Sequence, residues 1–345
     1  MIRPLRALVG ATLLGTLALS GCGAEEKTSA ADAAPTAAAG DRFPVTVHHA
    51  FGDTVIEKKP ERVATVAWAN HEVPLALGIV PVGMSKAAWG DDDGDGVLPW
   101  VEDKLTQLDA PTPTLFDESE GIDFEAVADT HPDVILAAYS GLTQEDYDTL
   151  SKIAPVVAEP GLPWATSMED MIRLDSEALG LKAEGDALIT RLDDTMTTSL
   201  DAHPSLKGKK ILFSYVDPKD LSQIGFYTTH DTRPGFLAGL GLPQPSIVTE
   251  RSEGSESFYE TISSEKASSF DDVDVFVGYG DDTTVATLQA DPLIGAIPAV
   301  KKGAVAILQD STPLAASANP SPLSIDWGID RYFDLLAAAA DRAAA

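Results

Sequence analysis

The sequence predicts an α/β protein with two Rossmann-like lobes, whose sheets are mainly parallel, joined by one long α-helix. Three observations predict this class. Strand and helix patterns alternate over residues 62–159, a helical pattern then runs from about 166 to 202, and the alternation resumes over 209–310. Strands separated by helices of this length form βαβ units, whose parallel sheets are covered on both faces. A folded body from about residue 43 to the end is long for one core and sufficient for two.

The first lobe is predicted from short apolar runs divided by breakers. The β-branched run RVATVAW predicts a strand, and a short helix follows that ends at Gly78. The later elements are a strand at 79–85, a helix at 124–130, a strand at 132–141, a helix at 145–154 and a strand at 155–159.

The connecting segment has apolar residues at steps of three and four, which is the period of an amphipathic helix. They are Met168, Met171, Ile172, Leu174, Leu179, Ala187, Leu188, Leu192 and Met196. Only Gly180 and Gly185 weaken the pattern, either as a kink or as the join of two helices. A segment of this length exceeds an ordinary helix, which predicts a rigid connection between the lobes.

The second lobe repeats the first. Its predicted elements are a strand at 209–217, a helix at 234–242, a helix and strand over 263–280, and a strand at 303–310. FEAVADTHPDVILAAYSG is answered by SEKASSFDDVDVFVGYG: each has an acidic residue, a helical turn, Asp-Val, and an apolar strand that ends near a tyrosine and a glycine. LALGIVPVG in the first lobe is likewise matched by LAGLGLPQP in the second. Two such echoes in the same order favour paired lobes.

The N-terminus predicts a secreted, lipid-anchored protein. Arg3 and Arg6 precede an uncharged apolar run over residues 7–19, which is short for a membrane span and typical of a signal peptide. The run ends in Leu-Ser-Gly-Cys, which resembles a bacterial lipobox, and Cys22 is the only cysteine, so it has no internal disulfide partner. We therefore expect a signal peptide at 1–21, a lipidated Cys22, a flexible tether to residue 42, and an extracytoplasmic location at the cell membrane.

The charge balance limits the partners. The chain has 24 Lys and Arg against 54 Asp and Glu, a net charge of −30. Such a surface repels phosphate backbones, so nucleic acid is not an expected partner. It also disfavours docking on anionic lipid through protein charge, which leaves the acyl anchor to hold the protein at the membrane.

The stretch GDDDGDGVLPWVE at 90–102 matches every position of the EF-hand calcium loop. Asp91, Asp93, Asp95 and Glu102 would supply the oxygen ligands. An EF-hand needs a helix on both sides, yet the preceding residues favour a strand and Pro99 occupies the ninth loop position. A calcium sensor is therefore not expected. Two alternatives remain: an acidic surface loop, or an isolated structural calcium site.

The sequence motifs do not support an enzymatic function. The chain has no G-x-S-x-G elbow, H-E-x-x-H motif, P-loop or dinucleotide-binding glycine fingerprint. Its six histidines are scattered, with His48 and His49 on an early predicted strand. We expect a protein that is not an enzyme and that has no cofactor.

Several stretches together resemble one family. They are the lipobox, RVATVAWANHEVPLALGIVPVG, FEAVADTHPDVILAAYSG with LSKIAPVV after it, the long helix, and PSPLSIDWGIDRYFDLLAAAA. In this order they are similar to the iron-siderophore substrate-binding proteins of ABC importers. The resemblance implies lobes at 43–163 and 205–345, a connecting helix at 164–204, a ligand cleft between the lobes, and a monomer that delivers a ferric siderophore to a permease for iron uptake. Heme, a corrinoid or a bare metal ion is the alternative ligand.

A ferric siderophore needs aromatic walls and a few polar donors, placed where parallel strands end. The expected ligand-binding residues are Trp68, Trp89 and Tyr139 in the first lobe and Tyr215, Tyr227, Arg233 and Arg251 in the second. The alternative is core packing for each aromatic residue and a surface ion pair for each arginine. Because only one or two arginines are available, the sequence favours a hydroxamate or mixed chelate over an anionic tris-catecholate.

In the family that the chain resembles, one exposed glutamate on each lobe docks against arginines of the two permease subunits. Glu125 and Glu265 match those positions. Each stands at the start of a predicted helix that leads into an Asp-Val strand, although the helix dipole alone favours an acidic residue there.

Overall fold

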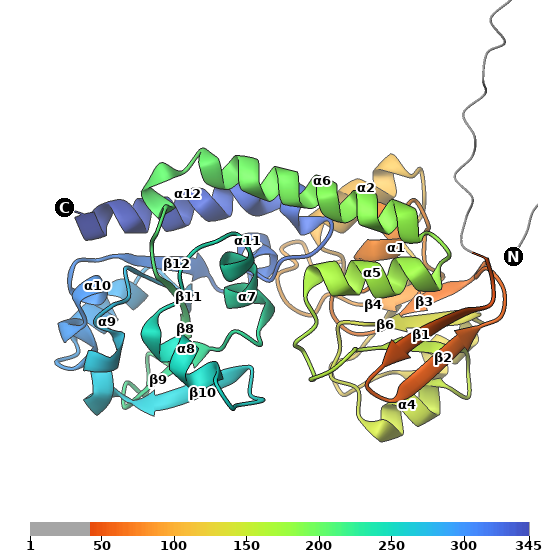
Figure 1. The fold of residues 1–345 in the computed structure, drawn as a ribbon, viewed down its shortest axis with the longest axis horizontal. Coiled ribbons are helices and arrows are strands. Elements are labelled where there is room, and N and C mark those ends of the chain that lie inside the picture. The colour runs from red at the N-terminus through yellow and green to blue at the C-terminus, as the bar shows by residue number, and fades with distance from the viewer. Residues whose placement is uncertain (1–41, 345) are drawn as a thin grey trace, which may run out of the picture. The chain divides into compact units, whose positions relative to one another are not determined.

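The structure, a computed structural model, describes residues 42–344, which contain two five-stranded sheets and a two-stranded hairpin (Figure 1). The predicted signal peptide, Cys22 and the tether up to residue 41 lie outside the described residues. Within the described part, none of the helices combines the length and the apolar composition that a bilayer span requires.

The first sheet is parallel throughout and has the strand order β5-β4-β3-β6-β7. Its strands are β3 (Val63–Thr65), β4 (Gly83–Ser85), β5 (Thr114–Phe116), β6 (Val134–Ala137) and β7 (Val156–Ala158). The helices between them are α1 (Glu72–Ala76), α2 (Pro99–Gln107), α3 (Phe124–Asp129) and α4 (Gln144–Leu150). The strands and helices predicted for this lobe are present. Every residue of β3, β6 and β7 is buried, as expected for parallel strands that are covered on both faces.

An antiparallel hairpin precedes this sheet. Its strands are β1 (Val45–His49) and β2 (Gly52–Ile56). Burial alternates along β1, so one face packs on the first lobe and the other meets solvent. His48 and His49 therefore lie on a strand, as predicted.

The second sheet is mixed, with the order β10-β9-β8-β11-β12. Its strands are β8 (Ile211–Tyr215), β9 (Gln223–Tyr227), β10 (Tyr259–Ser263), β11 (Val275–Gly280) and β12 (Val305–Gln309). β8, β11 and β12 are parallel, whereas β9 is antiparallel to both of its neighbours. The prediction of mainly parallel sheets is confirmed. The second sheet is antiparallel at this one edge, because the segment between β8 and β9 is too short for a helical crossover.

The remaining helices surround the second sheet. They are α7 (Thr232–Gly239), α8 (Ser246–Ser252), α9 (Thr284–Ala290), α10 (Pro298–Lys301), α11 (Pro313–Ser317) and α12 (Ser324–Ala344), with 3-10 turns at η1 (Pro204–Leu206), η2 (Ser264–Phe270) and η3 (Ile294–Ala296).

The connecting segment is two helices, α5 (Met168–Ala178) and α6 (Lys182–Asp201), so the expectation of one continuous helix over it is corrected. Of the two alternatives for the glycines, a kink in one helix or the join of two helices, the structure shows the join. Gly180 adopts a left-handed conformation with φ of 65°, which ends α5 in the way that glycine commonly ends helices. Gly185 lets α6 approach α5 closely, since a Cβ there would lie 2.1 Å from the Ser176 Oγ. α6 alone is the long helix between the lobes.

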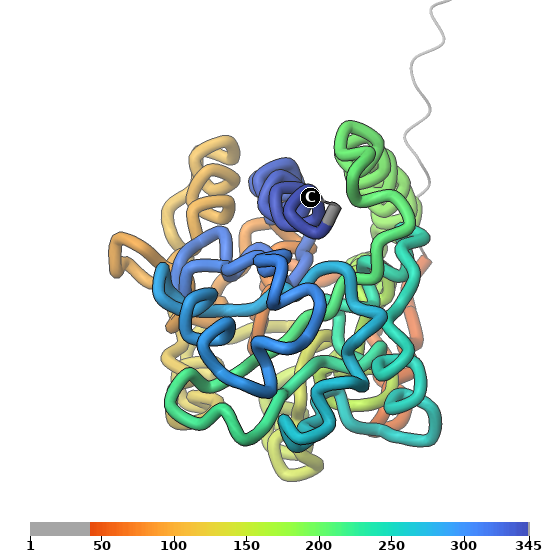
Figure 2. Tube along the Cα trace, turned by 90° about the vertical axis from the view of Figure 1, so that its left-hand side faces the viewer, coloured from red at the N-terminus to blue at the C-terminus, as the bar shows by residue number. Residues whose placement is uncertain are grey.

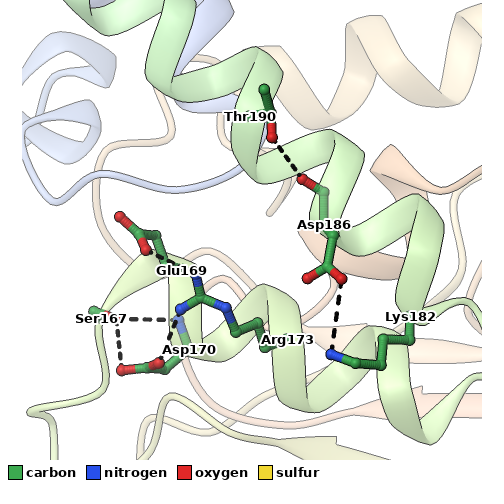
Figure 3. Close-up of polar contacts among 7 residues, drawn as sticks. All are labelled: Ser167, Glu169, Asp170, Arg173, Lys182, Asp186 and Thr190. Atoms are coloured by element: carbon green, nitrogen blue, oxygen red, sulfur yellow. Dashed lines mark hydrogen bonds and ion pairs between the residues drawn. The ribbon is translucent and has the colours of Figure 1, made fainter.

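Polar contacts fix both helices around this join (Figure 3). Ser167 caps α5 by accepting a hydrogen bond from the Asp170 amide at 3.0 Å. Arg173 pairs with Glu169 one turn earlier at 3.1 Å, and Lys182 pairs with Asp186 at 3.8 Å in the first turns of α6. Each contact is local to one helix and exposed, so together they favour helix formation without joining the lobes.

The two lobes share one core. α6 and α12 run side by side, α12 over the second sheet and α6 from the second lobe across to the first (Figures 1 and 2). One continuous cluster of buried apolar side chains includes Val134 of the first sheet, Leu192 of α6, Phe213 of the second sheet and Phe333 of α12. Such a shared core makes the connection stiff.

Candidate functional site

An ion pair at the start of α7 is the centre of the candidate site. Asp231 caps α7 by accepting a hydrogen bond from the Arg233 amide at 2.9 Å. The same carboxylate accepts two hydrogen bonds from the Arg233 guanidinium, Nε to Oδ1 and Nη2 to Oδ2, both 2.8 Å. The side chain of Arg233 is 15% exposed and that of Asp231 is 2% exposed. This is a bidentate, largely desolvated pair.

Aromatic rings surround the guanidinium. Its central carbon lies 3.9 Å from the ring centre of Tyr227 and 5.4 Å from that of Phe213, and Nη1 donates to the Tyr279 hydroxyl at 3.2 Å. Burial by itself lowers the pKa of Arg233, but the hydrogen bonds that it donates to Asp231 raise this pKa above its usual range. Burial raises the pKa of Tyr279 to about 12. The arginine is therefore a permanent cation stacked on an aromatic surface.

Two residues of the first lobe, Trp89 and Tyr139, contact residues of the second lobe around the guanidinium. Trp89, in the loop between β4 and α2, packs edge to face against Tyr279 with ring centres 5.2 Å apart. Asn319, between α11 and α12, donates to the Tyr139 hydroxyl at 3.2 Å and accepts a hydrogen bond from Thr232. We call Trp89, Tyr139, Tyr227, Asp231, Arg233, Tyr279 and Asn319 the aromatic-arginine cluster; it draws on both lobes.

A cavity of about 410 Å³ adjoins the cluster. It lies between the start of α5, the middle of α6 and α7. It shares Asp231 with the cluster and is also lined by the neighbouring Thr232. Its other walls include Met168, Met196 and Phe236 with the carboxylates of Glu169 and Asp193. Arg233 and the aromatic rings of the cluster are not among its lining residues. We place the candidate site at the cluster, because aromatic area and a guanidinium converge there at the contact between residues of the two lobes.

Comparison with known proteins identifies the family. Residues 63–312 match the family described as periplasmic binding protein. This chain belongs to that family. A crystal structure of PiaA from Streptococcus pneumoniae TIGR4 in complex with ferrichrome is 50% identical, covers 86% of this chain and 99% of its own, and superposes with a TM-score of 0.83.

Two curated relatives are more distant. The Fe(3+) dicitrate-binding periplasmic protein FecB of Escherichia coli is 24% identical over 275 residues, which are 78% of this chain and 84% of FecB. The probable siderophore-binding lipoprotein YfiY of Bacillus subtilis is 28% identical over 183 residues, and this chain spans only half the length of YfiY. The resemblance seen in the sequence and the two-lobed α/β fold are confirmed.

In this periplasmic binding protein, four of the seven expected ligand-binding residues belong to the cluster: Trp89, Tyr139, Tyr227 and Arg233. Tyr139 is 6% exposed, so its ring is mostly core and only its hydroxyl takes part in the contact between the lobes. Tyr227 stands on an antiparallel strand rather than after a parallel one.

The other three lie elsewhere. Trp68 follows β3 and is half-buried beside Met84 in the first lobe. Tyr215 ends β8 and is 45% exposed, on the strand next to Tyr227. Arg251 is exposed in the last turn of α8, whose buried residues Ile247 and Val248 pack in the core on the opposite face of the second sheet. The structure does not bring Arg251 to the cluster.

Three residues of the cluster were not singled out from the sequence: Asp231, Tyr279 and Asn319. Trp164, which packs beside the cluster, was not singled out either. Tyr279 had a usable signal, because it ends its strand where Tyr139 ends the corresponding strand of the first lobe. Asp231 had another, since an aspartate just before a predicted helix is a preferred N-cap. Trp164 packs against Tyr139 with ring centres 5.5 Å apart, and Asn319 lies in a loop. Nothing local in the sequence marks either of them.

The acidic loop brings the carboxylates of Asp91, Asp93 and Asp95 within 4.8 Å of one another. Asp91 accepts hydrogen bonds from the amides of Gly94 at 2.8 Å and Gly96 at 2.7 Å, and these contacts hold the turn. Burial and the nearby charges of Asp95 and Asp93 raise the pKa of Glu102. Strand β4 precedes the loop and α2 follows it, so it is not an EF-hand. An isolated calcium site stays a prediction.

Within residues 42–344, no histidine joins a group of three or more potential metal ligands, although His48 pairs with Asp53 and His203 with Asp334. Among residues 42–344, Asp91, Asp93 and Asp95 form the only group of three or more potential ligands close enough to share a metal ion. His71 is buried in the first lobe, which lowers its pKa to about 4. This arrangement disfavours the bare-metal alternative.

The two expected docking glutamates are both exposed. Glu125 lies in the first turn of α3 and Glu265 in the first turn of η2, each on a different lobe. Their role in docking stays a prediction.

Proposed function

We propose that the protein captures a ferric siderophore between its two lobes and delivers it to an ABC importer for iron uptake. The observation that carries this proposal is the aromatic-arginine cluster at the contact between the lobes. Its rings offer flat apolar area for the organic part of a chelate, and the stacked guanidinium offers N–H donors for the oxygens around the iron. The names of the relatives support the same ligand class, because ferrichrome and ferric dicitrate are both iron chelates.

A hydroxamate siderophore is the best-supported ligand. In a ferric tris-hydroxamate, the charges of the hydroxamate groups cancel that of the iron, so one arginine suffices for hydrogen bonding without a large positive field. Ferrichrome, seen in the complex with the S. pneumoniae protein, is such a compound. Heme and corrinoids remain the alternative ligands.

The binding test is a titration of intrinsic tryptophan fluorescence with ferrichrome, ferric citrate, heme and cobalamin. Trp89→Ala is expected to weaken ferrichrome binding by at least about tenfold while leaving the thermal midpoint nearly unchanged. Trp327→Ala is the matched control, because Trp327 lies on α12 beside Arg331 and Trp100, away from the cluster. Weaker binding that only follows a loss of stability would return Trp89 to core packing.

Delivery is tested separately from binding. Glu125→Ala combined with Glu265→Ala is expected to leave siderophore affinity intact and to impair uptake strongly, since charges at an interface rim set association rate and register. The control pair is Glu57→Ala with Glu184→Ala, which removes two other exposed glutamates. Normal uptake by the first pair at limiting ligand would refute the docking role.

The anchor is a third part of the proposal. Cys22→Ala is expected to release folded, ligand-competent protein from the membrane fraction, as the lipobox-like sequence suggests and as the description of YfiY as a lipoprotein supports. Continued sedimentation of the variant with membranes after a high-salt wash would contradict the lipid anchor.

A further inference from the structure

Arg233 is not a free positive charge. Its contacts with Asp231 and Tyr279 use three of the five N–H donors of a guanidinium. One donor on Nη1 and one on Nη2 remain for other acceptors. The carboxylate of Asp231 meanwhile cancels the charge at close range, within a site that is largely shielded from water. The site therefore keeps hydrogen-bond donors but has no net charge.

Nothing else in the cluster restores a positive charge. Its other members are neutral aromatic side chains and the amide of Asn319. The chain as a whole carries a net charge of −30, so the surrounding field is negative. An anionic chelate would meet Asp231 as a like charge, whereas an uncharged or cationic chelate would not.

We infer that Asp231 is a specificity-determining residue: by pairing with Arg233 it restricts the site to ferric chelates without net negative charge and discriminates against anionic carboxylate chelates such as ferric citrate. This inference rests on the proposed function, because it concerns the ligand of the same site. Asp231 acts through Arg233 and through its own charge.

Because Asp231 caps α7, a substitution that keeps the cap can remove its negative charge alone. Asp231 accepts the Arg233 amide at the N-cap of α7, and asparagine caps helices as well as aspartate does. Asp231→Asn therefore keeps the cap and the shape while it removes the negative charge. Adding Arg233→Gln to it removes the positive charge too, so the double variant has a neutral site again.

The experiment measures dissociation constants for ferrichrome, which is uncharged, and for ferric citrate, which is anionic, by tryptophan fluorescence with the full chain. The wild type is expected to prefer ferrichrome. In Asp231→Asn, the ratio of the two dissociation constants is expected to move at least about tenfold toward ferric citrate. The double variant is expected to reverse that shift.

Each outcome decides a different point. A wild type that binds ferric citrate as tightly as ferrichrome overturns the inference, and so does an unchanged ratio in a folded Asp231→Asn. If that variant fails to fold, the wild type is tested with ferrioxamine B, a cationic chelate. An affinity for ferrioxamine B that is close to the affinity for ferrichrome and far above that for ferric citrate supports the inference. Any other order of affinities overturns the inference. A wild type that binds none of these chelates contradicts the proposed function itself.

Discussion

Replacing Glu72 by glutamine should make the stability of the protein less sensitive to pH. Glu72 begins α1 and is 1% exposed. One carboxylate oxygen accepts a hydrogen bond from the Trp100 indole at 2.7 Å, and the other accepts one from the Leu323 amide at 2.8 Å. Glu72 thus fastens the first lobe to the start of α12. Burial outweighs these hydrogen bonds and raises the pKa of Glu72 to about 7 from 4.5.

The size and sign of the effect follow from that difference. Because the folded protein holds the proton more tightly than the unfolded chain, the stabilisation is complete below pH 4.5 and is lost as the pH rises to about 7. The difference in pKa corresponds to about 3 kcal/mol, of which about 2.5 kcal/mol falls between pH 5 and 8. Glutamine does not titrate, but it leaves one buried N–H without an acceptor, at a cost of about 1–3 kcal/mol at every pH.

The assay is urea unfolding of the wild type and of Glu72→Gln at pH 5 and pH 8. The variant is expected to be less stable than the wild type at pH 5 and to recover about 2.5 kcal/mol relative to it at pH 8. Glu57→Gln, an exposed glutamate, controls for the loss of one negative charge. If the difference between Glu72→Gln and the wild type is the same at both pH values, the reasoning about Glu72 is wrong.

Two further predictions concern the join of α5 and α6. Gly185→Ala should lower the free energy of unfolding by about 1–3 kcal/mol, because its Cβ would lie 2.1 Å from the Ser176 Oγ. The loss should be smaller when Ser176 is also replaced by glycine. Equal losses with and without Ser176→Gly would refute the close contact. Burial raises the pKa of Asp175 well above its usual range, and neither carboxylate oxygen has a hydrogen-bond partner. Stability is therefore lost as the pH rises, and Asp175→Asn should stabilise the protein more at pH 8 than at pH 5 by urea unfolding; a smaller effect at pH 8 would contradict this.

The strands of the parallel sheet were predictable because burial on both faces leaves a continuous apolar run. Val63–Thr65 and Val134–Ala137 are fully buried, and both were found as β-branched or aliphatic stretches. β9 and β10 were missed because their burial is partial and their pairing is antiparallel, so Gln223–Tyr227 carries no strong local signal. The join at Gly180 was foreseen only as one of two alternatives, since a glycine shows where a helix can break and not whether it does.

The candidate site was predictable only in part. Trp89, Tyr227 and Arg233 have side chains whose chemistry suggests ligand contact, and the structure brings them into the cluster. Arg251 has the same chemistry, yet its helix packs on the other face of the sheet. Asn319 joins the cluster through contacts with residues far away in the sequence, which no local pattern encodes.

The most direct test of the account is a fluorescence titration of the protein with ferrichrome, carried out on the wild type and on Arg233→Gln. The wild type is expected to show saturable quenching with a stoichiometry of one, and Arg233→Gln is expected to bind at least about tenfold more weakly, because it loses donors to the oxygens around the iron. The central claim would be contradicted if the wild type bound heme, cobalamin or a bare metal ion saturably but did not bind ferrichrome, ferrioxamine B or ferric citrate.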